Sequence, residues 1–133
     1  MQRKTNSEII SATFSQGRVV ASYKEAAKAF YTKSLFGEIK EDKIMYSFVE
    51  ALYLLDQGNL EVKEKKRKLS TASFIKKAEK KDPNFWVRYC VFRELRSRGY
   101  IVKTALKFGA DFRVYEKGIK PGDDHAKWIV FPV

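Results

Sequence analysis

The spacing of apolar residues changes at Gly99, and this change constrains the fold of the chain's second half. Before Gly99, aromatic residues recur every three or four positions, as on one face of a helix. They are Phe85, Tyr89 and Phe92, and Trp86 beside this stripe is also expected in the core rather than as a base-stacking residue. After it, three short runs have the composition of strands: Tyr100 to Thr104, Asp111 to Glu116, and Ala126 to Phe131. A helix that ends at a glycine before three strands predicts an α/β (α+β) second half.

The first half contains similar signals. Apolar residues occupy alternate positions in Glu8 to Phe14, and Arg18 to Ala21 repeats this pattern. Gln16 and Gly17 between them are an expected tight turn, so the sequence predicts a small hairpin. Ser47 and Glu50 have the spacing of a capping box, so a helix is expected to begin at Ser47. A start nearer Ile44 remains an alternative. Further elements are expected at Tyr23 to Phe30 (helix), Phe36 to Ile39 (strand), Leu60 to Val62 (strand) and Ser70 to Lys80 (helix).

Two segments are expected at junctions between elements. Residues Lys63 to Lys68 read KEKKRK and are expected to form a solvated connector, with phosphate contact as the alternative. Asp82 and Pro83 are expected to open the next helix as its N-cap and first residue. We therefore expect an amino-terminal α/β domain over residues 1–68 and a second domain over residues 69–133.

The net charge of +11 and the pI near 9.7 favour a polyanionic partner, either nucleic acid or an anionic membrane. No run approaches the roughly 20 apolar residues of a spanning helix, and Met1 to Gln16 lacks the apolar part of a secretory signal. A single cysteine, Cys90, leaves no internal disulfide and fits the reducing cytoplasm. One histidine and one cysteine give no metal-ligand cluster, although Asp123, Asp124 and His125 leave a weak divalent-metal alternative.

Tyr115 and His125 are the candidate catalytic pair. Alternation places Phe112 and Val114 on one face of a strand, and Asp111, Arg113 and Tyr115 on the other. The following loop returns the chain antiparallel, so Tyr115 leaves one strand where His125 enters the next. Both side chains are then expected at one end of adjacent strands, within reach of one small ligand.

The segment Tyr89 to Gly118, YCVFRELRSRGYIVKTALKFGADFRVYEKG, resembles the entry to the nuclease domain of archaeal tRNA-splicing endonucleases. Its LRxRGY, GADF and VYxxG patterns carry this resemblance. Residues Phe48 to Val62, FVEALYLLDQGNLEV, are similar to the helix–strand unit of that family's amino-terminal domain. The resemblance implies a small α/β domain followed by a nuclease domain, in which helices flank a mixed sheet.

The resemblance also implies an active site of Tyr, His and Lys that needs neither metal nor cofactor. Tyr115 would take the proton of the RNA 2′-hydroxyl, and His125, which titrates near neutrality, would protonate the leaving 5′-oxygen. The products would be a 2′,3′-cyclic phosphate and a 5′-hydroxyl. Nothing in the chain matches the family's lysine, because Lys117, Lys120 and Lys127 lack its context.

The implied function is cleavage of precursor tRNA at exon–intron junctions, by a subunit of a homo- or hetero-oligomer. A non-catalytic structural or RNA-binding subunit is the alternative, and a DNA-binding module has only the charge in its favour. The strand Trp128 to Val133 is apolar and has no successor, so another chain or segment is expected to complete the sheet and supply the lysine. The candidate RNA contacts are Arg93, Arg96, Arg98, Lys103, Lys107 and Arg113.

Overall fold

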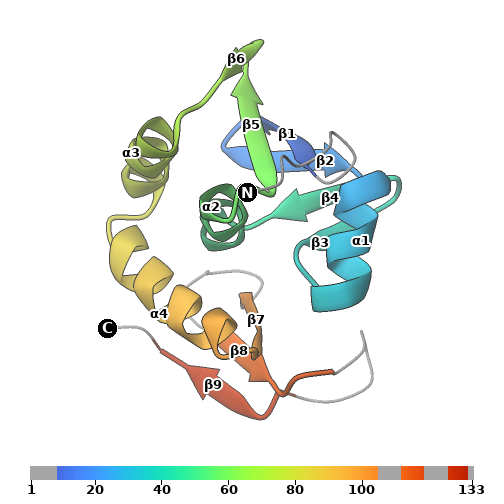
Figure 1. The fold of residues 1–133 in the computed structure, drawn as a ribbon. Helices are drawn as coiled ribbons and strands as arrows, with labels where there is room; N and C mark the ends of the chain where they lie inside the picture. The colour runs from blue at the N-terminus through green and yellow to red at the C-terminus, as the bar shows by residue number, and fades with distance from the viewer. Residues whose placement is uncertain (1–8, 105–111, 119–125, 132–133) are drawn as a thin grey trace. The chain divides into compact units, whose positions relative to one another are not determined.

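The computed structural model describes residues 9–104, 112–118 and 126–131, which form helices and strands in the order shown in Figure 1. The chain divides into two compact units, Met1–Asp82 and Pro83–Val133. Each unit combines helices with its own sheet, so the predicted α/β class is confirmed. Within the described residues, no helix is long and apolar enough to span a membrane.

The first unit contains a mixed sheet in the order β3-β4-β2-β1-β5-β6. Strands β1 and β2 form the predicted hairpin, and β1 also pairs in parallel with β5. The bounds are β1 Ile10–Ser15, β2 Arg18–Ser22, β3 Glu38–Lys40, β4 Lys43–Tyr46, β5 Leu60–Glu64 and β6 Arg67–Lys68. The sequence prediction missed β4, because its four residues follow β3 after only a two-residue turn.

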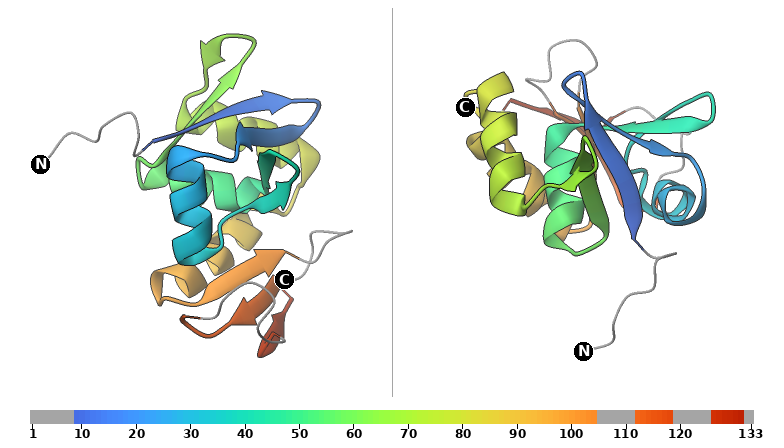
Figure 2. Two further views of the ribbon diagram at one scale, coloured as in Figure 1. Left: turned by 90° about the vertical axis from the view of Figure 1, so that its right-hand side faces the viewer. Right: turned by 90° about the horizontal axis from the view of Figure 1, so that it is seen from above.

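Three helices accompany this sheet: α1 Glu25–Ser34, α2 Phe48–Asp56 and α3 Thr71–Lys81. Alternate residues of β1 are buried, including Phe14. The Phe14 ring lies 6.0 Å from Phe48 of α2 and 6.3 Å from Phe74 of α3, measured between centroids. The views in Figures 1 and 2 agree that α2 lies between α1 and α3. The aromatic contacts therefore hold both α2 and α3 against β1.

The predicted capping box at the start of α2 is confirmed. The Ser47 side chain accepts a hydrogen bond from the Glu50 backbone, and Glu50 accepts one from the Ser47 backbone at 3.0 Å. Glu50 is buried, and its second carboxylate oxygen accepts a bond of 2.8 Å from the Gly37 N–H. The alternative helix start near Ile44 is wrong, because Ile44 is a fully buried residue of β4.

The charge run is not the simple connector that the sequence predicted. Its first residues end β5, its last residues form β6, and Glu64 pairs with Arg67 across a two-residue turn. Lys65 and Lys66 form that turn with φ angles of 49° and 72°. Such turns favour Asn-Gly, because positive φ costs other residues on the order of 1 kcal/mol each. The Lys-Lys pair gave no turn signal in the sequence.

The units divide after Asp82, whereas the expected domain boundary followed residue 68. Helix α3 begins after Ser70, whose side chain accepts a hydrogen bond from the Ser73 backbone N–H. Because Phe74 of this helix packs on Phe14 of β1, α3 belongs to the first unit. Asp82 ends α3 and does not open the next helix, contrary to the prediction. Residues 83 and 84 form a turn, and α4 runs over Phe85–Ser97.

The second unit combines α4 with a sheet in the order β7-β8-β9, in which both described pairings are antiparallel. The strands are β7 Ile101–Thr104, β8 Phe112–Tyr115 and β9 Trp128–Val130. Phe85, Tyr89 and Phe92 are fully buried, which confirms the predicted stripe of α4. Trp86 was expected in the core but is 45% exposed. The centroid of its ring lies 5.6 Å from that of Tyr89.

Candidate active site

The two faces of β8 differ, as the alternation predicted. Phe112 and Val114 are buried, and the Phe112 ring lies 5.8 Å from Phe92 of α4. Arg113 and Tyr115 alternate with them and are half-buried. Tyr115 therefore lies on the opposite face of the sheet from the α4 contact. Asp111, which was expected on this face, lies outside the described residues.

Tyr115 is the last residue of β8 and pairs with Ile101, the first residue of β7. Strand β9 returns antiparallel, and its approach is fixed by the Lys127 N–H, which donates to the Val114 carbonyl at 2.9 Å. The chain thus enters β9 at the end of the sheet where Tyr115 leaves β8. His125, the other predicted catalytic residue, lies outside the described residues, so its position relative to Tyr115 stays a prediction.

Two cations share the face that carries Tyr115. Lys103 of β7 pairs directly with Arg113 of β8. Arg113 also donates to the Thr104 carbonyl at 3.4 Å. Tyr115 follows Arg113 by two residues, a separation of roughly 7 Å along a strand. The register of β7 and β8 therefore places two cationic side chains next to each other on this face.

Two other lysines lie near Tyr115 in the sequence. The Lys127 ammonium forms a hydrogen bond and ion pair with the Glu116 carboxylate, and these contacts raise the pKa of Lys127. The same ammonium lies 5.2 Å from the centre of the Trp128 ring. The Lys117 side chain runs so close to Gly99 that a Cβ at that position would clash with it. Lys127 thus has an ion-pair partner, and Lys117 packs against Gly99. Lys107 and Lys120 lie outside the described residues.

The arginines of α4 have mainly structural contacts. Arg96 is 7% exposed and donates to the Val102 carbonyl at 3.4 Å, so its side chain is largely buried, and its contact with RNA stays a prediction. Arg98 forms an ion pair of 2.7 Å with Glu94, one turn earlier in the same helix. Arg93 is exposed, with its guanidinium 5.5 Å from the centre of the Tyr89 ring. The side chains of Arg93 and Arg98 are exposed to solvent, whereas the side chain of Arg96 is buried.

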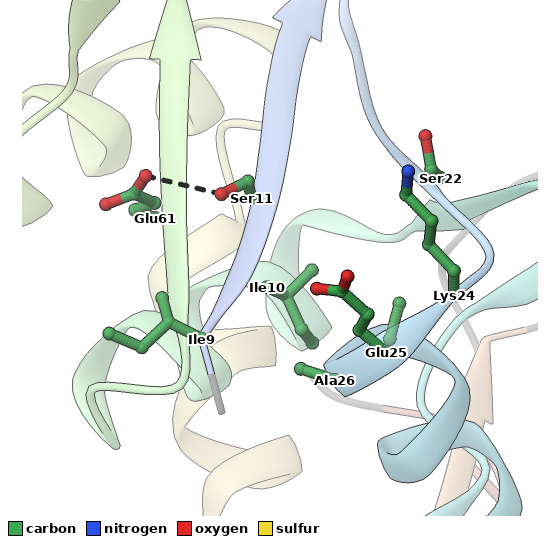
Figure 3. Close-up of a pocket in the computed structure, with 9 residues that line it drawn as sticks. Ile9, Ile10, Ser11, Ser22, Lys24, Glu25, Ala26 and Glu61 are labelled. Carbon is green, nitrogen blue, oxygen red and sulfur yellow. Dashed lines mark hydrogen bonds between the residues drawn. The ribbon is translucent and has the colours of Figure 1, made fainter. Parts of the chain in front are cut away.

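A pocket of about 410 Å³ lies in the first unit, between the start of β1, the start of α1 and Glu61 of β5 (Figure 3). Ser11 donates to Glu61 at 3.3 Å across one side of it. Its lining contains neither candidate catalytic residue. Among the described residues, no three His, Cys, Asp or Glu side chains gather as metal ligands would. The weak metal alternative at Asp123 to His125 lies outside that range.

Two protein-family models match this chain. Residues 85–133 match the catalytic C-terminal domain of the tRNA intron endonucleases, and residues 10–75 match the N-terminal domain of the same enzymes. The chain belongs to the tRNA intron endonuclease family. The first match includes Tyr115 and the whole three-stranded sheet, and the second includes the sheet of the first unit.

Curated relatives agree with this membership of the endonuclease family. The tRNA-splicing endonuclease of Thermococcus gammatolerans is 40% identical over 114 residues, which cover 86% of this chain and 66% of that protein. The protein of the same name from Thermococcus onnurineus is 37% identical, covering 95% and 72%. That of Nanoarchaeum equitans is 47% identical, covering 74% and 69%. The chain thus aligns with about two thirds of the length of these relatives.

The individual side chains Lys103 and Arg113 were predicted as RNA contacts, but their pairing was not. That relationship depends on the register between β7 and β8, which pairs Val102 with Val114 on the buried face. A search for two cations that would pair across the predicted hairpin could have found it.

Proposed function

We propose that this chain is a subunit of a tRNA intron endonuclease that cleaves precursor tRNA at exon–intron junctions. The family matches over residues 10–75 and 85–133 carry this proposal. The position of Tyr115 supports it, because the phenol lies at a strand end on the face that also carries Lys103 and Arg113. These cations would hold the phosphate backbone beside the phenol. The lone cysteine favours action in the cytoplasm.

The proposed reaction uses the RNA as its own nucleophile. Tyr115, as the phenolate, takes the proton of the 2′-hydroxyl, and the 2′-oxygen forms a bond to the neighbouring phosphorus. The bond from phosphorus to the 5′-oxygen breaks, and His125 as imidazolium gives that oxygen a proton. The products are a 2′,3′-cyclic phosphate and a 5′-hydroxyl.

The family resemblance includes a lysine that stabilises the charged intermediate. Lys117 lies against Gly99, and Lys127 pairs with Glu116, so neither is a good candidate for this role. We propose that a different segment or a partner chain in an oligomer supplies the lysine. Lys103 is the candidate from within the described sheet if the chain acts without that help.

The test is incubation of the protein with an intron-containing precursor tRNA in EDTA. Cleavage at both junctions with cyclic phosphate ends is expected, either from the chain alone or after a candidate partner is added. His125→Ala should abolish cleavage and leave RNA affinity nearly unchanged. Tight binding without cleavage under every combination would contradict the catalytic proposal and favour the non-catalytic RNA-binding subunit.

A further inference from the structure

The positive charge of the first unit is concentrated in one segment. Residues 9–60 hold six Lys or Arg and six Asp or Glu, so they are neutral overall. Residues 61–82 hold nine Lys or Arg and four Asp or Glu. This segment comprises β5, β6 and α3. The excess of five positive charges therefore lies on a hairpin and a helix, while the rest of the described unit contributes none.

The fold brings the hairpin and the helix that carry this charge into contact. Strand β6 is the edge of the sheet, and Figure 1 shows the β5–β6 hairpin leading directly into α3. Lys77 of α3 forms an ion pair of 2.8 Å with Glu64 of β5. The Lys81 side chain lies beside Gly17 in the β1–β2 turn, with its Cε 3.4 Å from the point where a Cβ on that glycine would lie. Helix, hairpin and turn are thus in contact.

The lysines of α3 share one flank of the helix. At about 100° per residue, Lys76, Lys77, Lys80 and Lys81 fall within roughly 140° of the helix circumference. Phe74 and Ala78 define the buried stripe, and Lys77 and Lys81 border it. The helix dipole favours Lys80 and Lys81 in the last turn, but it does not explain Lys76 or the charge on the hairpin.

The tip of the hairpin provides an independent observation. Lys65 and Lys66 are exposed and occupy two consecutive left-handed positions that Asn and Gly normally fill. Unfavourable backbone conformations that persist in a fold are frequently associated with function. Here they project two ammonium groups from the sheet edge, which a neutral turn would not do.

We propose that these elements form a second RNA-contact surface that binds the phosphate backbone of helical RNA outside the cleavage site. The surface, called the basic ridge below, comprises the hairpin tip and the flank of α3, with Lys65, Lys66, Arg67, Lys76, Lys77, Lys80 and Lys81. This inference rests on the proposed function for the identity of the RNA, a precursor tRNA with base-paired arms.

The composition of the basic ridge favours a duplex over a single strand. Proteins that bind single strands use exposed aromatic rings on which bases stack. Phe74, the sole aromatic residue in residues 61–82, is fully buried against Phe14 and Phe48. Cations without stacking partners suit the regular phosphates of an A-form helix, which proteins recognise mainly by shape and backbone contacts.

The test is the affinity of the full chain for a plain RNA duplex without a junction, measured by fluorescence anisotropy at several salt concentrations. Lys65→Asn with Lys66→Gly removes two charges and installs the residues that the turn prefers, so the fold is retained. We expect binding roughly tenfold weaker near 0.1 M salt, and a slope of log K against log salt reduced by about 2. Lys76→Gln with Lys80→Gln should have a similar effect.

The matched control is Lys28→Gln with Lys33→Gln, which removes two exposed charges from α1 in the same unit. Its affinity should stay within about twofold of the unaltered chain. An equal loss in this control, or unchanged affinity in the hairpin variant, overturns the inference. Loss of binding to phosphatidylserine vesicles without loss of binding to the duplex would also overturn it, because the partner would then be a membrane.

The outcome is separable from that of the proposed function. If precursor tRNA is cleaved and the hairpin variant binds the duplex as before, the basic ridge inference alone fails. If precursor tRNA is bound but never cleaved and the hairpin variant loses affinity, the catalytic proposal fails and the basic ridge remains. If the unaltered chain binds neither RNA, both fail.

Discussion

Lys103 and Arg113 face each other across β7 and β8, on the side of the sheet that carries Tyr115. A phosphate group bound at this face would form charge-assisted contacts with both side chains. The register of β7 and β8 thus places both cations on the face that is proposed to bind RNA.

Replacing Lys103 with Gln tests this relationship. RNA affinity should fall, and the slope of log K against log salt should decrease by about 1, because one phosphate contact is lost. The free energy of unfolding should change by no more than about 0.5 kcal/mol, because Lys103 lies at a partly exposed position of the sheet. Filter binding and urea denaturation measure the two effects. A less stable protein with unaltered salt dependence would contradict the assignment of Lys103 to RNA binding.

Tyr115→Phe should remove the proposed base and retain the aromatic ring. Single-turnover cleavage of precursor tRNA, by the form of the protein that is active, should slow by about 100- to 10,000-fold. RNA affinity should stay within about twofold, because the contacts of Lys103 and Arg113 are intact. A cleavage rate equal to that of the unaltered protein would exclude the phenol from the reaction.

Glu50 is expected to be a major determinant of the first unit's stability. Its carboxylate accepts bonds from the Gly37 N–H, the Ser47 N–H and the Ser47 hydroxyl. Glu50→Ala leaves these buried or partly buried donors without that acceptor, so the free energy of unfolding should fall by about 3 kcal/mol. Chemical denaturation measures the loss. Glu79→Ala on the exposed side of α3 is the control and should change stability by less than about 0.5 kcal/mol.

Tyr46 should make stability depend on alkaline pH. Burial, followed by the Glu50 carboxylate, raises the pKa of its hydroxyl above the ordinary 10.0. The unfolded chain releases this proton first, so the contribution is fully present below pH 10 and is lost as the pH rises towards the folded-state pKa. The expected loss is about 1.4 kcal/mol per pH unit above 10. Comparison with Tyr46→Phe in urea titrations at pH 9 to 11 isolates this residue from the lysines.

Tyr46→Phe should also be tolerated at neutral pH. The Tyr46 hydroxyl is buried, and no hydrogen-bond partner for it lies among the described residues. Removal of a buried unsatisfied hydroxyl is expected to leave stability unchanged or to raise it by about 1 kcal/mol. A large destabilisation at pH 7 would show that the hydroxyl has a favourable contact.

The sequence predicted those features whose determinants are local. The capping box at Ser47 and the aromatic stripe of α4 depend on side chains three or four residues apart, so their spacing is visible in one dimension. The alternation in β8 also identified its buried face. The RGY, GADF and VYxxG patterns lie within one continuous segment, which is why the family resemblance and Tyr115 could be found without a structure.

Tertiary structure decided what depends on partners distant in the sequence. Trp86 was expected in the core and is exposed, whereas Arg96 was expected to contact RNA and is buried. The packing of α4 on its sheet determines which side chains face the solvent. The register of β7 and β8 paired Lys103 with Arg113, and antiparallel pairing of β5 and β6 turned a charge run into a hairpin. Backbone hydrogen bonds between strands carry no side-chain code of their own, so pairing follows from the burial of both strands at once.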